Sequence, residues 1–107
     1  MGRNEEQAAR NEVVFRTANE ELGRKRQELH IEGPTPFLCE CENESCTELV
    51  QLELGEYEHV RENPRHFLVV PGHDGDGNRQ VEVHDRFAIV EKTGVGGIIA
   101  EQEDPRQ

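Results

Sequence analysis

The sequence has no tryptophan and few apolar side chains, which excludes a large hydrophobic core. Hydrophobic residues make up 33% of the 107-residue chain, the same share as charged residues. A chain of this length forms one small domain at most, in which apolar burial barely offsets the lost conformational entropy. A further constraint, such as a bound metal ion, would therefore add usefully to the stability of the fold.

Basic residues are also few, and long apolar runs are absent. The chain has 12 Lys and Arg residues against 23 Asp and Glu, for a formal net charge of -11. Nucleic acids and anionic membranes attract positive charge, so we expect the chain to bind neither. No segment has the roughly 20 apolar residues of a membrane span, and residues 1–22 are too polar for a secretory signal. These absences favour a cytoplasmic protein.

Cysteine is scarce but concentrated, because Cys39, Cys41 and Cys46 lie within eight residues of one another. An odd number of cysteines fits a complete disulfide framework poorly, and in a reducing cytosol clustered cysteines are more often metal ligands. The C-x-C-x4-C spacing lets one loop offer three thiolates to Zn²⁺, which binds thiolate and imidazole tetrahedrally. Such a site needs a fourth ligand from another part of the chain.

His73 is the predicted fourth ligand. It follows Pro71-Gly72, a pair that predicts a sharp turn able to direct the imidazole back toward the cysteines. His66 and His84 are the alternatives. The expected cofactor is therefore Zn²⁺, held in a closed structural site.

Two other kinds of chemistry fit the cysteine cluster less well. A zinc enzyme would need an open coordination position and a general base, and we expect the nearby Glu40, Glu42 and Glu44 to be solvated. A redox thiol would need a lowered pKa, whereas these acids would raise the thiol pKa values in the absence of metal. A thiol or zinc redox sensor remains an alternative, because loss of zinc would unfold the site.

The spacing of Cys39, Cys41 and Cys46 resembles the zinc knuckle of the post-SET segment in histone lysine methyltransferases. The match covers about eight residues. The Asn-His-x-Cys element and the cofactor glycines of those enzymes are absent, so the resemblance implies metal ligands and no methyltransferase activity.

A wider pattern includes Phe37-Leu38-Cys39-Glu40-Cys41, Cys46, Tyr57, Val60-Arg61, Pro64, Phe67, Pro71-Gly72-His73 and Asp85-Arg86. This pattern resembles a family of small bacterial proteins of unknown function, over about residues 4 to 92. The resemblance implies that His73 belongs with the cysteines, and it implies no activity.

A long helix is predicted over residues 4 to about 30. Ala8, Phe15, Leu22 and Leu29 recur every seven residues and form a narrow apolar seam. The seam indicates an amphipathic helix lying on the domain, with self-association as the sharper alternative. Charged residues four apart in the favourable order, such as Glu12 with Arg16, are expected to pair along the helix and support it.

The rest of the chain predicts short strands and one short helix. Alternation at Val50, Leu52 and Leu54 indicates a half-buried strand, and residues 55–63 indicate a helix that Pro64 ends. The apolar run 66–70 predicts a buried strand. Residues 37–38, 81–83 and 87–90 also have strand-like patterns, the last two as a strand pair or one bent strand.

These patterns together predict an α+β fold. Its parts are a helical arm at 1–32, a zinc-knuckle domain at 33–92 and a Gly-rich acidic tail at 93–107, mobile except for possible docking of 95–100. The favoured function is a non-enzymatic protein-interaction or regulatory module whose partner is another protein.

Overall fold

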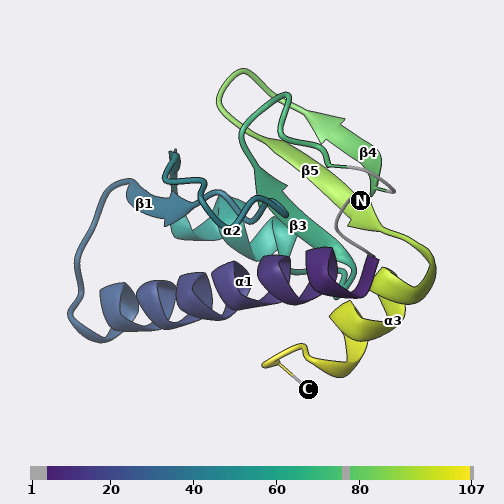
Figure 1. Ribbon diagram of the computed structural model, residues 1–107. Helices are drawn as coiled ribbons and strands as arrows, with labels where there is room; N and C mark the ends of the chain where they lie inside the picture. Colours follow the sequence, from purple (N-terminus) through teal and green to yellow (C-terminus); the bar gives the residue numbers. More distant parts are fainter. Residues whose placement is uncertain (1–4, 76–77, 107) are drawn as a thin grey trace.

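The computed structural model describes residues 5–75 and 78–106 and confirms the predicted α+β class (Figure 1). The elements are α1 (Glu5–Glu28), β1 (Thr35–Leu38), β2 (Leu49–Leu52), α2 (Leu54–Val60), β3 (His66–Val69), β4 (Asn78–Val83), β5 (Ala88–Lys92) and α3 (Gly94–Gln102). The predicted helix start at residue 4 lies outside the described residues.

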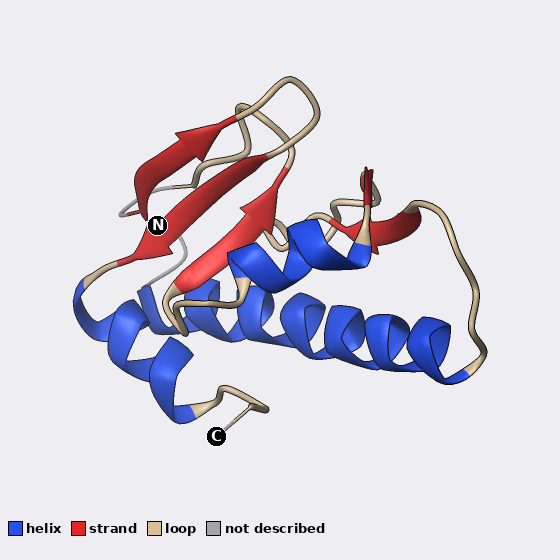
Figure 2. Cartoon of the chain, turned by 180° about the vertical axis from the view of Figure 1, so that it is seen from behind, coloured by secondary structure: helices blue, strands red, loops and turns tan. Residues whose placement is uncertain are grey.

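The strands form two small antiparallel sheets (Figure 2). β1 pairs with β2, with Phe37 opposite Val50. The second sheet has the order β3-β5-β4 and places Leu68 of β3 opposite Ile89 of β5. Residues 81–83 and 87–90 therefore belong to a pair of strands rather than to one bent strand.

Side chains pack on both faces of β3, which explains the uninterrupted apolar run over residues 67–69. Leu68 and Ile89 contact Phe37 and Tyr57 on one face. On the other face, Phe67 belongs to a second cluster that includes the cysteines at positions 39 and 41. A strand covered on both sides has no position at which a polar side chain reaches water.

Helix α1 runs along one side of the molecule and packs against β1 and α3 (Figure 1). Its buried face differs from the predicted seam. Glu12, Arg16 and Asn19 are each 0% exposed, whereas Leu29 is 65% exposed. The predicted Glu12–Arg16 pair does not form, because both side chains turn into the fold.

Each buried charge of α1 is matched by a partner on another element. The Glu12 carboxylate lies 2.9 Å from Lys92 Nζ at the end of β5. Arg16 donates to the carbonyl oxygens of Pro64, at 2.7 Å, and Ala100, at 2.8 Å, and its guanidinium lies over the Phe67 ring. These contacts offset the desolvation cost of burying charge.

The structure differs from the prediction of a mobile tail. Residues 94–102 form helix α3, which packs against α1 and β5, and Ala100 is fully buried. The glycines of this segment predicted mobility, but in the structure they allow the helix backbone to lie close to β5. A Cβ atom at Gly97 would lie 2.7 Å from the Lys92 carbonyl oxygen, too close for any other residue.

We expect Arg16→Ala to lower the free energy of unfolding by about 3 kcal/mol or more. The substitution leaves two buried carbonyl groups without donors and removes the cation that covers Phe67. Urea denaturation followed by circular dichroism measures the change. Arg10→Ala, on the exposed face of the same helix, is the control and should cost less than about 0.5 kcal/mol. Equal effects from the two substitutions would contradict the buried role of Arg16.

Candidate metal centre

The structure brings the four predicted ligand residues together. One ligand atom from each of Cys39, Cys41, Cys46 and His73 lies within 4.8 Å of the others. His73 Nδ1 is 3.6 Å from the sulfur of Cys39 and 3.8 Å from that of Cys46. A tetrahedral zinc with bonds of about 2.3 Å to sulfur and 2.0 Å to nitrogen has nitrogen–sulfur edges of about 3.5 Å and sulfur–sulfur edges of about 3.8 Å. The spacing therefore suits a metal ion.

Cys39 and Cys41 are positioned by a short segment that runs beside two strands. The Cys39 amide donates to the Glu48 carbonyl at 3.1 Å, which extends the pairing of β1 with β2 by one step. The next amide, that of Glu40, donates to the Leu68 carbonyl of β3 at 2.6 Å. Because side chains alternate along extended backbone, the two cysteines on either side of Glu40 project the same way.

A tight turn brings Cys46 back to the first two cysteines. The Asn43 side-chain oxygen accepts from the Ser45 amide at 3.0 Å, and the Asn43 carbonyl accepts from the Cys46 amide at 3.0 Å. Asn favours such turns because its side chain replaces a backbone acceptor. Cys46 is half-buried, whereas Cys39 and Cys41 are buried.

His73 reaches the cluster through the predicted turn after β3. Its amide donates to the Val70 carbonyl at 2.9 Å, closing a four-residue turn around Pro71 and Gly72. Gly72 has a φ of 94°, the conformation that a type II turn requires after proline. The Val70 amide also donates to the Cys39 sulfur at 3.2 Å, which fixes the thiol against the end of β3.

The two alternative histidines lie elsewhere. His66 is paired with Glu91 at 3.6 Å, and His84 is paired with Glu82 at 2.8 Å and stacks on Phe87. Neither belongs to a possible metal-binding group among the described residues, where the set with His73 is the one found.

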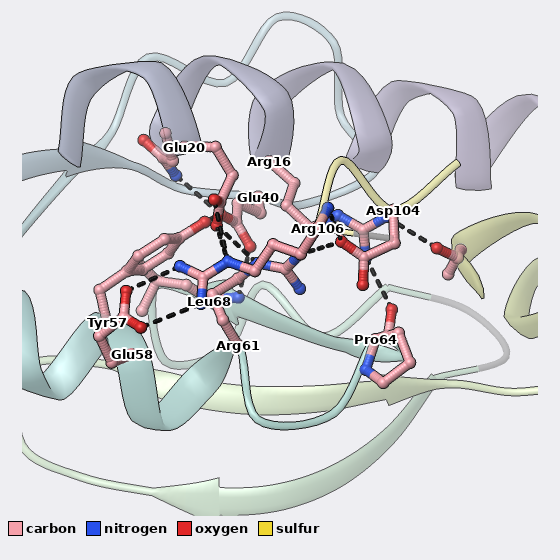
Figure 3. A network of polar contacts seen from close by, with 12 residues as sticks. Arg16, Glu20, Glu40, Tyr57, Glu58, Arg61, Pro64, Leu68, Asp104 and Arg106 are labelled. Atoms are coloured by element: carbon pink, nitrogen blue, oxygen red, sulfur yellow. Dashed lines mark hydrogen bonds and ion pairs between the residues drawn. The ribbon is translucent and has the colours of Figure 1, made fainter. Parts of the chain in front are cut away.

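Glu40 is fully buried, so the prediction that it is solvated is wrong. One carboxylate oxygen accepts from Asn19 Nδ2 at 2.8 Å and from the Tyr57 hydroxyl at 2.5 Å. The other oxygen accepts from the Leu68 amide at 2.9 Å (Figure 3). Burial raises the pKa of Glu40, while these hydrogen bonds lower it. The carboxylate thus joins α1, α2 and β3 between two of the cysteines.

Burial is also the main influence on the thiols. It raises the pKa of Cys39 above its ordinary value, and the neighbouring thiols raise it further, although the Val70 amide lowers it. Burial likewise raises the pKa of Cys41. Thiols that are costly to ionise alone are poor nucleophiles, and a divalent cation would supply the charge that stabilises their thiolate forms.

Asn19 and Tyr57 are the supporting residues that the sequence patterns missed. Asn19 also accepts from the Leu38 amide at 2.8 Å, immediately before the first cysteine. A signal for its burial was present, because Ala8, Glu12, Arg16 and Asn19 recur at helical spacing. A search for apolar periodicity does not identify this face of the helix, because most of its residues are polar.

The fold and site thus define a small α+β protein with a Cys3His cluster suited to a metal ion. No protein-family model matches the chain, and the comparisons with curated proteins and with solved structures also gave no match. The two resemblances noted from the sequence stay predictions. Among the described residues, no helix is long and apolar enough to cross a membrane.

We expect His73→Ala to weaken metal binding by at least about 100-fold, because a direct ligand should matter more than the supporting groups whose loss costs 10- to 100-fold. Competition with a chromophoric chelator measures the affinity for added Zn²⁺. His84→Ala is the matched control and should leave the affinity unchanged, since His84 pairs with Glu82 instead. Unchanged affinity in His73→Ala would exclude that residue as a ligand.

Glu40→Ala should destabilise the fold by about 3 kcal/mol or more, because three donors lose their shared acceptor and two of them, the Tyr57 hydroxyl and the Leu68 amide, have no other acceptor among the described residues. It should also weaken metal binding by about 10- to 100-fold, as loss of a ligand-positioning group does. Urea denaturation and chelator competition measure the two effects. Glu44→Ala, on the exposed part of the same loop, is the control. Wild-type metal affinity in Glu40→Ala would show that Glu40 does not position the cysteines.

Proposed function

We propose that this chain is a non-enzymatic protein-interaction module whose fold is held together by a structural Zn²⁺ ion. The observation that carries the proposal is the convergence of Cys39, Cys41, Cys46 and His73 on one point. Three of these come from a single loop, and the fourth comes from the turn after β3.

The donor set favours zinc over other ions. Three sulfur donors and one imidazole suit Zn²⁺, whereas Ca²⁺ and Mg²⁺ prefer oxygen ligands. The distances from His73 Nδ1 to the Cys39 and Cys46 sulfurs, 3.6 and 3.8 Å, fit tetrahedral coordination.

A structural role is favoured over catalysis for two reasons. Four protein ligands fill a tetrahedral zinc, while catalytic zinc sites use three and keep a position for water. In addition, the Glu40 carboxylate, which lies between two ligands in the sequence, accepts hydrogen bonds from Asn19, Tyr57 and Leu68. The Glu40 carboxylate is therefore used by hydrogen bonds within the core, and it is not available as a general base at the Cys3His cluster.

Zinc would join parts of the chain that otherwise meet through a thin core. The loop of residues 39–46, which holds the three cysteines, continues from β1, and His73 follows β3. One ion would therefore connect the small sheet to the larger one. Zinc binding of this kind contributes on the order of 10 kcal/mol of apparent folding free energy. That is comparable to the whole stability of a typical small domain.

The acidic charge of the chain supports an interaction role. The net charge of -11 favours a partner with basic groups. A second copy of the chain is the weaker candidate, because Ala8 of the predicted seam is buried inside the fold while Leu29 is exposed. The predicted seam therefore does not form one continuous stripe for self-association.

We expect protein purified without chelator to contain one Zn²⁺ per chain by elemental analysis. Removing the ion should unfold the chain or lower its thermal midpoint sharply, because the buried thiols lose the cation that holds them together. Circular dichroism with temperature follows the change, and adding Zn²⁺ back should restore the original curve. Mg²⁺ added at the same concentration is the control and should restore nothing.

Two outcomes would count against the proposal. Purified protein that lacks stoichiometric zinc would remove its basis. A zinc-free chain with an unchanged melting curve would show that the ion is not structural and would favour a zinc enzyme with an open site.

A further inference from the structure

A cavity of about 530 Å³ lies between α1 and α2, lined by residues other than the four of the Cys3His cluster. Its lining includes Glu20 and Glu21 from α1 and Glu58 from α2. The cavity is open beside Gly55, because a Cβ atom built at that position would have no neighbour within 4 Å. The cavity is therefore an open groove between two helices, and Arg24 and Arg106 also line it beside these acidic side chains.

The segment after α3 already places an arginine at this groove. Arg106 Nε lies 2.9 Å from both carboxylate oxygens of Glu20. Its two terminal nitrogens donate to the two oxygens of Glu58 at 3.0 and 2.7 Å (Figure 3). All three nitrogens of this guanidinium thus donate to two carboxylates from different helices.

The groove is built to hold its carboxylates in place. Arg61, whose side chain is 0% exposed, donates through Nε to Glu20 at 2.8 Å and also pairs with Asp104. Glu20 is 19% exposed, so its position is set before any ligand arrives. Glu58 is 62% exposed, and Arg106 is its ion-pair partner among the described residues. Without Arg106, Glu20 would keep its position through Arg61, and the exposed Glu58 carboxylate would be left without that ion-pair partner.

We propose that the α1–α2 groove is a recognition site for an arginine side chain of a partner protein, and that Arg106, which lines the groove, competes for its carboxylates Glu20 and Glu58 from within the chain. The occupant is a segment with an exposed arginine, chosen by charge complementarity with Glu20 and Glu58. The inference deepens the proposed interaction function and rests on it. It does not depend on the metal, whose ligands lie outside the groove lining.

Arginine rather than lysine is expected because of geometry. A planar guanidinium presents several donors in a fixed fork and pairs with a carboxylate through two parallel bonds. Arg106 pairs in this way with Glu58 and engages Glu20 on another edge. A lysine ammonium is a compact point charge and would not match both carboxylates in the same way.

The test uses the full chain and the tripeptide acetyl-Gly-Arg-Gly-amide as the probe. Titration into ¹⁵N-labelled Arg106→Ala, followed by amide chemical shifts, should give changes at residues 20–24 and 54–58. The variant should bind the peptide at least about 10-fold more tightly than wild type, because its groove lacks the internal competitor. Arg106→Gln, which retains much of the side-chain length, is a second variant in which the same gain is expected.

Two controls identify the recognition. Adding Glu58→Gln to Arg106→Ala should reduce binding by at least about 5-fold, through loss of the paired carboxylate. The lysine tripeptide, acetyl-Gly-Lys-Gly-amide, should bind more weakly than the arginine peptide by a similar factor.

Equal affinity of wild type and both Arg106 variants would overturn the proposal. Shifts spread over the surface, or equal binding of the two peptides, would do the same by indicating general attraction to an acidic protein. Zinc content measured on the same samples separates this result from the proposed function. Full zinc with no groove binding removes the arginine site alone, and absent zinc with groove binding removes the structural ion alone.

Discussion

The buried carboxylate of Glu40 is the interaction on which the arrangement of the molecule depends. It receives hydrogen bonds from Asn19 on α1, Tyr57 on α2 and the Leu68 amide on β3, so one side chain ties three elements together. A buried carboxylate without these donors would cost several kcal/mol. Because it lies between Cys39 and Cys41, the same contacts that satisfy it also turn both thiols to one side of the chain.

The Cys3His cluster and this polar network support each other. The cluster brings the loop of residues 39–46 next to the turn after β3, and Glu40 holds the same loop to helices α1 and α2. The polar face of α1 is also held by specific partners. Arg16 donates to backbone carbonyls, and Glu12 pairs with Lys92. With few apolar side chains available, the fold gains specificity from paired charges as well as from hydrophobic burial.

The parts of the fold that the sequence predicts are those determined by local patterns. Apolar runs and alternation located β2 and β3, and the Pro71-Gly72 turn after a strand indicated His73, the histidine that lies beside the three cysteines. That these residues bind zinc stays a prediction. Two features, the burial of Glu40 and the order of α3, could not be predicted from local patterns because tertiary contacts determine them. Glu40 has acidic neighbours that suggest solvent, and the glycines of α3 suggest mobility until their contact with β5 is known.

We propose that three thiolates and one imidazole of this chain bind one zinc ion. X-ray absorption at the zinc edge of the purified protein measures this coordination, because sulfur and nitrogen shells differ in distance. Three sulfur ligands at about 2.3 Å and one nitrogen at about 2.0 Å are expected. A spectrum with fewer than three sulfur ligands, or with an additional oxygen from water, would contradict a closed structural site.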